Sequence, residues 1–353
     1  MKIGIVTHPF GINYGGILQA YALQTILEKQ GHTVYFVRRN KEKCIKIKKI
    51  GKELIGLLRF FIINNYLIER IIYDKKIRSF VNSKFHNYYY IDDESNIKLD
   101  VLVAGSDQIW RRWSEKWDLM FYFLDFATKW KVKRYSYAAS FGLSDWKFDQ
   151  NETKAIKYYL SLFNKVTVRE VDAIKLLKDT LDIDSELVLD PTFLLKKEDY
   201  LDSLNIEANL CHMFVSYILD KDSLKNDIVQ SLSQFLNEDA FEVGSPQKCK
   251  NYTMLPGVED WIANMSGAKY VVTDSFHGTV FSIIFNKNFV VLSNEFRGQS
   301  RLNSLLSLVG LQNRMVSTKE EALKIIQTPI NWSRINTIVS NKRTNSLEFL
   351  FNM

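Results

Sequence analysis

The chain has 353 residues, of which 46% are hydrophobic and 25% are charged, with a formal net charge of +7. At about 100–200 residues per domain, this length predicts two globular domains, and the absence of a Gly/Ser-rich linker predicts that they pack together. Three isolated cysteines indicate reduced thiols in the cytoplasm, and the most apolar window, residues 54–63, is too short to span a bilayer.

The first half of the chain predicts a βαβ opening followed by further strands. Residues 2–7 (KIGIVT) form a short apolar run typical of a buried parallel strand, residues 17–31 have helical spacing, and residues 33–38 return to a strand. Residues 41–90 interrupt this rhythm and predict two inserted amphipathic helices. Further strands are expected near residues 100–104, 133–138, 164–168 and 186–190.

A second α/β unit is expected after a boundary near residues 195–210. Strands at 212–218, 240–244, 268–274 and 289–293 alternate with helices around 223–236 and 258–265. The sequence therefore predicts an N-terminal domain over 1–200 and a C-terminal domain over 201–330, with a terminal helix over 331–353 that returns to the first domain.

Polar residues follow five of the predicted strands, where ligands bind in doubly wound sheets. Because the carboxyl ends of parallel strands share one edge of a sheet, we expect these residues to line a cleft. They are Asn13, Tyr14, Gly15 and Gly16 after the first strand, Ser106, Asp107 and Gln108, then Ser140, Arg169 with Glu170, and Asp274, Ser275 and His277 with Gly278.

His277 stands at the crossing from a buried strand to a helix. Asp274 and Ser275 are more natural helix caps, which leaves His277 for another task, such as donating a proton or contacting an anion. The alternative is a histidine that only satisfies the core.

Cationic side chains also stand at predicted strand ends. Arg169 suits bidentate capture of a carboxylate or phosphate, although an internal pair with Glu170 or another acid explains it equally well. Arg297 and Arg301 follow a later strand, and one of the two is expected to face the cleft.

Several familiar cofactor signals are missing from the sequence. The pair Gly15-Gly16 opens a helix and could admit an anion, but it could also be a tight turn, and neither GxGxxG nor GxxxxGK[ST] occurs. The five histidines show no metal-binding spacing, so neither a metal nor a cofactor is predicted. No nucleic-acid partner is predicted either.

Several segments resemble the polysaccharide pyruvyl transferases. They are NYGGILQAYALQ, VLVAGSDQIW, VTVRE, VLDPTFLL and above all AKYVVTDSFHGTVFSIIFNKNFVVL, and the likeness runs from about residue 1 to about residue 311. The resemblance implies two Rossmann-like modules facing across a cleft, similar to the glycosyltransferase B-type fold. It also implies phosphoenolpyruvate as donor, a saccharide acceptor of exopolysaccharide or capsule synthesis, and a pyruvate ketal as product.

The resemblance also implies roles for individual residues. His277 matches the family's catalytic histidine, Arg169 matches a donor-binding arginine, and Arg297 or Arg301 stands where relatives often carry a basic residue. Ser275 and Gly278 flank this donor site, and Asp107 is the candidate base or orienter on the acceptor side by its position alone.

Two alternatives to the pyruvyl transfer remain open at this point. One is a glycosyltransferase with a nucleotide-sugar donor, for which Glu259 and Asp260 next to Trp261 could serve. The other is a noncatalytic saccharide-binding protein, for which the many aromatic residues could stack on sugars. A lipid-linked acceptor and peripheral contact with the inner membrane face, through the basic residues of 41–90, also stay open.

Overall fold

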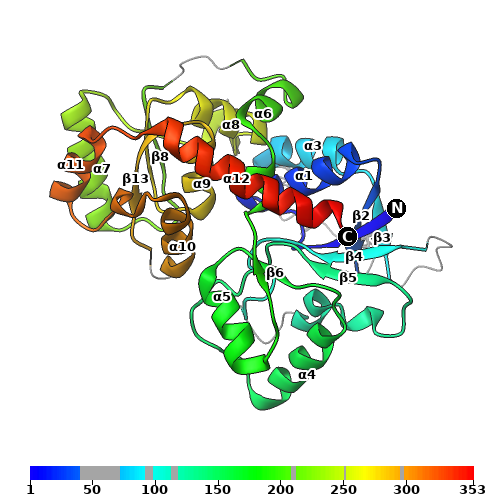
Figure 1. Cartoon of the computed structure of the whole chain (residues 1–353). Helices are drawn as coiled ribbons and strands as arrows, with labels where there is room; N and C mark the ends of the chain where they lie inside the picture. The colour runs from blue at the N-terminus through cyan, green and yellow to red at the C-terminus, as the bar shows by residue number, and fades with distance from the viewer. Residues whose placement is uncertain (40–71, 92–97, 113–117, 208–211, 250–251, 295–297) are drawn as a thin grey trace, which may run out of the picture.

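The computed structural model describes residues 1–39, 72–91, 98–112, 118–207, 212–249, 252–294 and 298–353. Within these residues the chain forms two α/β modules, each built on a five-stranded sheet whose paired strands are parallel. Figure 1 shows the two modules side by side, with the terminal helix α12, drawn in red, running from the second module to the first.

The first sheet has the strand order β3-β2-β1-β4-β5, so its order reverses between β1 and β4. Short apolar runs form its central strands because both faces of the sheet are covered; in β1, four of the five residues are buried. A small parallel pair, β6-β7, continues from β5 through isolated bridges. The strands are β1 (Lys2–Val6), β2 (Thr33–Arg38), β3 (Tyr88–Tyr90), β4 (Val101–Ala104), β5 (Lys133–Ser136), β6 (Thr167–Val168) and β7 (Glu186–Leu187).

Helices and short turns of helix cover this first sheet. The first of them, α1, begins where the Asn13 side chain accepts a hydrogen bond from the Gly16 backbone N–H, and it is followed by Gly31 at a φ of +81°. The helices are α1 (Tyr14–Lys29), α3 (Lys75–Lys84), α4 (Gln150–Ser161), α5 (Val171–Leu176) and α6 (Lys197–Ser203), with the short turns η1 (Leu119–Phe123), η2 (Asp125–Ala127), η3 (Leu177–Leu181) and η4 (Pro191–Leu194).

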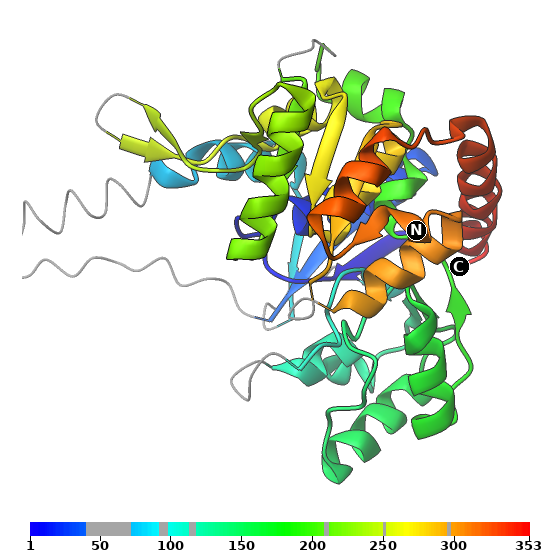
Figure 2. The ribbon, with the colours of Figure 1, turned by 90° about the vertical axis from the view of Figure 1, so that its left-hand side faces the viewer.

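The second sheet has the strand order β14-β13-β12-β8-β9, and its order reverses between β8 and β12. The strands and helices of the second module are β8 (Phe214–Tyr217), α7 (Ser223–Leu236), β9 (Phe241–Glu242), α8 (Val258–Gly267), β12 (Tyr270–Thr273), α9 (Phe276–Ile284), β13 (Asn288–Leu292), α10 (Gln299–Val309), η5 (Gln312–Arg314), β14 (Met315–Val316) and α11 (Lys319–Gln327). The terminal helix α12 (Trp332–Phe351) follows them. An antiparallel hairpin, β10 (Gln247–Cys249) with β11 (Tyr252–Met254), projects from this module beside α3 (Figure 2).

The terminal helix α12 packs on the first module. The ring of Phe349 contacts those of Tyr135 and Tyr137, and the Ser346 hydroxyl accepts a hydrogen bond from the Leu189 backbone N–H at 3.0 Å. One hydrophobic cluster accordingly contains buried residues of the first sheet, the second module and α12 together. The two modules are therefore joined by a continuous core.

Part of the predicted insertion differs from expectation. Most of the two helices expected over 41–90 lie outside the described residues, but Tyr88–Tyr90 form a strand that pairs with β2 at the edge of the first sheet. Three tyrosines in a row resemble an amphipathic helix end as much as a short strand. Pairing with the open edge of β2 decides between them.

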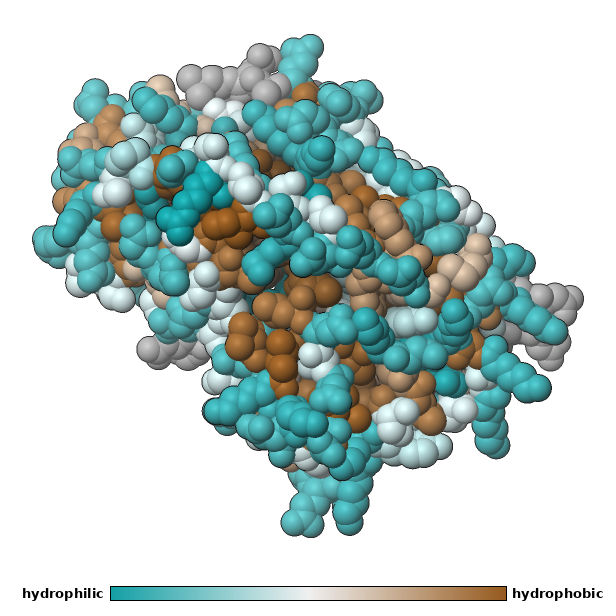
Figure 3. All heavy atoms as spheres, in the orientation of Figure 1, coloured by the Kyte–Doolittle hydropathy of each residue, from teal (hydrophilic) through white to brown (hydrophobic). Residues whose placement is uncertain are grey.

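Figure 3 shows that hydrophilic side chains cover most of one face, with hydrophobic atoms visible along its middle. Across the described residues, none of the helices combines the length and the apolar composition that a bilayer crossing needs.

Candidate functional site

His277 lies in the first turn of α9, directly after the buried strand β12. The hydroxyl of Ser275 caps this helix by accepting a hydrogen bond from the Gly278 N–H at 3.3 Å. The Thr273 hydroxyl accepts a bond from the Ser275 N–H at 3.1 Å, which fixes the turn. Because another residue makes the cap, the His277 side chain is left to face the first module, with 8% of it exposed.

Asp274 is not the cap; it anchors the neighbouring loop. Its carboxylate accepts hydrogen bonds from the backbone N–H groups of Leu219 at 2.7 Å and Asp220 at 3.2 Å. It also accepts from Lys225 Nζ and Asn294 Nδ2, both at 2.9 Å. The turn that holds His277 is therefore tied to the loops after β8 and β13.

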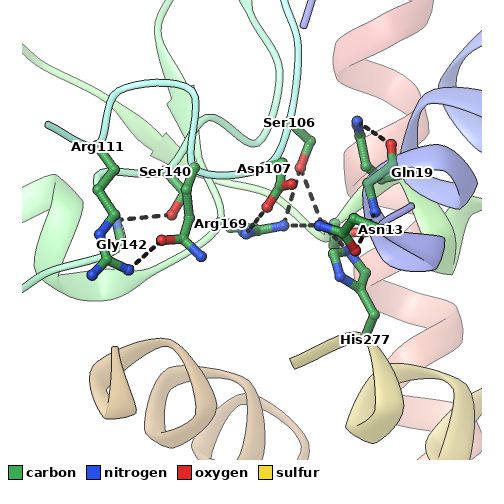
Figure 4. Close-up of polar contacts among 12 residues, drawn as sticks. Asn13, Gln19, Ser106, Asp107, Arg111, Ser140, Gly142, Arg169 and His277 are labelled. Carbon is green, nitrogen blue, oxygen red and sulfur yellow. Dashed lines mark hydrogen bonds and ion pairs between the residues drawn. The ribbon is translucent and has the colours of Figure 1, made fainter. Parts of the chain in front are cut away.

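Arg169 follows β6 and lies among three carboxylates. Its Nη1 donates to Asp190 Oδ2 at 2.5 Å, its Nη2 donates to Asp107 Oδ1 at 3.0 Å, and its Nε lies 3.8 Å from Glu170 Oε2. The side chain is 1% exposed. In this arrangement the arginine is an internal bridge between the loops after β4 and β7. Figure 4 shows its contact with Asp107.

Asp190 joins this bridge to His277. One carboxylate oxygen accepts bonds from the backbone and hydroxyl of Thr192, at 3.0 and 2.6 Å. The other accepts from Ser106 Oγ at 3.1 Å and from Arg169, and lies 3.7 Å from His277 Nε2. Asp190 was predicted only as the end of a strand, so its contact with His277 was missed. Its pairing runs between modules, which local sequence does not encode.

The charges of this cluster set the pKa values of its acids. Burial raises the pKa of Asp107, but the positive charge of Arg169 and the nearby His277 outweigh it and lower that pKa to about 2. Burial is likewise outweighed at Asp190, whose pKa lies well below its ordinary value because His277 and Arg169 stabilise the carboxylate. At Glu170 burial prevails and the pKa is raised.

Gly15 in the first turn of α1 makes room for His277. A Cβ atom at Gly15 would lie 2.1 Å from His277 Nδ1, so only glycine allows the two modules to approach here. At Gly16 a Cβ would meet the Asn13 side chain at 3.3 Å and Asp107 Oδ2 at 3.5 Å. The Gly15-Gly16 pair, singled out as a possible anion site, thus lies where the two modules meet.

Two arginines flank the ring of Phe276, next to His277. The guanidinium carbons of Arg169 and Arg301 lie 4.4 and 5.6 Å from the ring centroid. Burial, with the charge of Arg169, lowers the pKa of Arg301 to about 9. The other candidate, Arg297, lies outside the described residues.

The remaining predicted residues lie on the first module around this cluster. Ser140 Oγ accepts a hydrogen bond from the Gly142 N–H at 3.1 Å, and Gln108 Oε1 accepts from Arg111 Nη1 at 2.6 Å. The hydroxyl of Tyr14 points to the second module and donates to a backbone carbonyl there at 2.8 Å. Figure 4 shows Ser140 and Arg111 on one side of Arg169, and Asn13 and His277 on the other.

A second histidine near the cluster was also missed. His8 follows β1, its Nδ1 lies 3.2 Å from the Tyr122 hydroxyl, and it is close enough to Asp107 to lower the pKa of that acid. Burial lowers the pKa of His8, and Asp107 partly offsets this effect. Only its position at a strand end could have indicated it. Among the described residues, no group of His, Cys, Asp and Glu side chains could hold a metal ion.

Comparison with known proteins gives one family and several structures of similar fold. A family profile described as polysaccharide pyruvyl transferase matches residues 13–295. No curated protein sequence matches the chain.

The similar structures include UDP-GlcNAc 2-epimerase from Methanocaldococcus jannaschii, with 14% identity, a TM-score of 0.51, and coverage of 94% of this chain and 93% of that one. Arabidopsis thaliana UGT89C1 complexed with UDP has 9% identity, a TM-score of 0.53, and coverage of 99% and 98%. S. aureus MnaA with UDP has 13% identity, a TM-score of 0.50, and coverage of 100% and 95%. At these identities the likeness shows the fold alone, and the predicted glycosyltransferase B-type architecture is confirmed.

Proposed function

Because the chain belongs to the polysaccharide pyruvyl transferase family, we propose that it transfers a pyruvyl group from phosphoenolpyruvate to two hydroxyls of a saccharide and releases phosphate. The observation that carries this proposal is the buried cluster of His277, Arg169, Asp107 and Asp190, at the carboxyl ends of strands from both modules. It combines a proton donor with guanidinium groups, which a small carboxylate-phosphate donor requires.

The proposed reaction balances its protons within this cluster. The His277 imidazolium gives a proton to the methylene carbon of the donor, while the first sugar hydroxyl bonds to the central carbon and loses its own proton. The bond from that carbon to the phosphate oxygen then breaks, and the second hydroxyl takes the vacated position. Of the two hydroxyl protons, one restores His277 and the other leaves with phosphate.

Arg169 is proposed to change partners when the donor binds. Its guanidinium is held by Asp107 and Asp190, and Asp107 is the more exposed of the two acids, at 11% against 1%. A donor oxygen that displaced Asp107 from Arg169 would remove the main positive charge near that carboxylate and make it a stronger base. In this scheme Asp107 orients the cluster before binding and assists the sugar hydroxyl afterwards.

Ser275, Gly278 and Arg301 complete the proposed donor side; of the two candidate arginines, Arg301 is the one that lies beside Phe276. The loops of the first module that carry Asn13, Ser106, Gln108 and Ser140 are proposed to bind the acceptor. The scattered cysteines support a cytoplasmic site of action.

Phosphate release from phosphoenolpyruvate tests the proposal. The purified protein is incubated with the donor and a panel of free and lipid-linked oligosaccharides, with the His277→Gln variant as the blank. Phosphate release that depends on one saccharide, with a pyruvate ketal found on that saccharide, supports the function.

The unfolding temperature measured with phosphoenolpyruvate and with nucleotides distinguishes a pyruvyl transferase from a glycosyltransferase. Stabilisation by phosphoenolpyruvate is expected. Stabilisation by UDP or GDP, with none by phosphoenolpyruvate, would favour a glycosyltransferase instead.

A further inference from the structure

A hollow lies between the modules, next to the His277 cluster. It has a volume of about 600 Å³. The first module contributes Ile12, Asn13, Tyr14 and Tyr73, and the second contributes residues of the loops after β8 and β9 together with Leu255.

This hollow lies beside the turn that carries His277. Asn13 and Tyr14 directly precede Gly15, which touches His277. On the other wall, the ring of Tyr217 would lie 3.1 Å from a Cβ at Gly278. The strand order of the second sheet reverses between β8 and β12, so the hollow and His277 share the crevice where such sheets bind ligands.

The charge of the hollow differs from that of the cluster. Its charged lining residues are Lys221 and Glu242, whose side chains pair at 2.6 Å and are 49% and 39% exposed. The His277 cluster instead has Arg169 and Arg301 beside Phe276. The charges of Lys221 and Glu242 are already paired, so an uncharged ligand is favoured in the hollow. The guanidinium groups that could meet an anionic donor lie at the cluster instead.

The lining suits a sugar ring. The exposed side chains of Ile12 and Leu219 and the half-buried Tyr73 offer apolar surface to the C–H face of a pyranose. Asn13, Lys221 and Glu242 offer hydrogen bonds to its hydroxyls. The volume lies within the ~300–1,000 Å³ of typical ligand pockets and exceeds what a three-carbon donor fills.

We propose that this hollow binds an uncharged saccharide unit of the acceptor, next to the unit that receives the pyruvyl group at His277. The inference rests on the proposed function for the identity of the neighbouring reaction, but its binding test does not. The proposal predicts that the protein recognises at least a disaccharide and that it contacts the sugar unit next to the one that it modifies.

Saturation-transfer NMR with uncharged mono-, di- and trisaccharides of galactose, mannose and N-acetylglucosamine tests the site. The wild type is compared with the double variant Lys221→Ala/Glu242→Ala. Both side chains are partly exposed, and surface pairs contribute little to stability, so this variant is expected to fold. The control is Lys178→Ala/Asp182→Ala, which removes another exposed pair, at 2.8 Å, away from the hollow.

We expect the wild type and the control to bind one di- or trisaccharide at least tenfold more tightly than its monosaccharide. The Lys221/Glu242 variant should lose that preference while phosphoenolpyruvate binding, measured by calorimetry, stays within twofold. Equal saccharide binding by both double variants overturns the proposal, as does a wild type that binds none of the panel. Loss of UDP binding in the Lys221/Glu242 variant also overturns it, because the hollow would then take a nucleotide.

The two proposals fail in different ways. Absence of phosphoenolpyruvate binding and of phosphate release counts against the pyruvyl transfer alone. Loss of saccharide preference confined to the Lys221/Glu242 variant supports the hollow whatever the donor is.

Discussion

His277 does not cap helix α9, so its imidazole can be replaced without disturbing the turn before that helix. Ser275 makes the cap, and Asp274 anchors the loop after β8. We therefore expect His277→Gln to keep its unfolding temperature and to bind phosphoenolpyruvate within about tenfold, while turnover falls by ~10² or more. Calorimetry and phosphate release measure the two effects. Normal turnover, or loss of the fold, would make His277 a structural residue.

Arg169 is expected to behave differently because it neutralises buried acids. The donor-binding role that the resemblance implies for Arg169 predicts that Arg169→Ala mainly weakens donor binding. Its removal also leaves Asp107 and Asp190 without their common partner, and breaking a buried ion pair costs about 3–5 kcal/mol. Urea unfolding should show this loss, whereas Arg112→Ala, from the more exposed pair with Glu152, should change stability by less than about 1 kcal/mol. Equal effects would mean that the buried bridge is energetically unimportant.

Asp107 predicts a dependence of stability on acid. Its pKa is about 2 in the folded chain against an ordinary 3.8, so its contribution is fully present above pH 3.8 and is lost as the pH falls through about 2. The shift corresponds to about 2 kcal/mol at neutral pH. Asp190 acts in the same direction, and Glu170, with its raised pKa, acts in the opposite one.

Unfolding of the wild type and of Asp107→Asn between pH 5 and pH 2 measures this effect. The variant should be less stable at pH 5 and should lose less stability on acidification. Parallel curves for the two proteins would show that Asp107 is not stabilised by its charged neighbours.

The sequence indicated which residues lie near one another better than it indicated which of them form ion pairs and hydrogen bonds. Asp107, Arg169 and His277 were expected together because each follows a strand, and the structure brings them into one cluster. Asp190 was read as a strand stop, and the bridge through Arg169 was only one of two interpretations. Strand ends follow from local periodicity, whereas the partner of a buried charge depends on residues about 20 to 90 positions away in the chain.

At the scale of elements, the close approach of helices α1 and α9 depends on the absence of a side chain at Gly15. Gly15→Ala would place its Cβ 2.1 Å from His277 Nδ1, so the two helices must separate or the imidazole must turn. We expect a loss of about 1–3 kcal/mol in stability, as in other overpacked sites, together with a large fall in turnover. Gly11→Ala is the control, because its Cβ would meet nothing within 4 Å. If the two variants matched in activity, the close approach would not matter.

Long periodic segments were predicted well, and some of the short strands were not. Strand β2 has the expected bounds of residues 33–38, and α7 spans the expected 223–236. The three-residue strands β3, β10 and β11 were missed. Elements this short have too little sequence to show a period, and the partner strand decides whether they form.

At the scale of the whole molecule, helix α12 connects the two modules by following the second module in sequence and packing on the first. Phe349 is 8% exposed and packs on Tyr135 and Tyr137 of the first module, whereas Phe351, two residues on, is 58% exposed. Phe349→Ala should lower the free energy of unfolding by about 3–5 kcal/mol, while Phe351→Ala should change it by less than about 0.5 kcal/mol. Chemical denaturation of both variants measures the difference. A small effect at Phe349 would show that α12 is dispensable for the first module.

The return of α12 also has a consequence for synthesis on the ribosome. Domains generally fold as the chain emerges, N-terminal part first. The first module, however, receives its covering helix only after the second module has left the ribosome. Until then the side chains around Tyr137 that α12 later covers stay open to water and to other nascent chains. We infer that the interval between the two events is when this protein most depends on chaperones. Slow codons placed before residue 332 should lengthen that interval and raise the aggregated fraction.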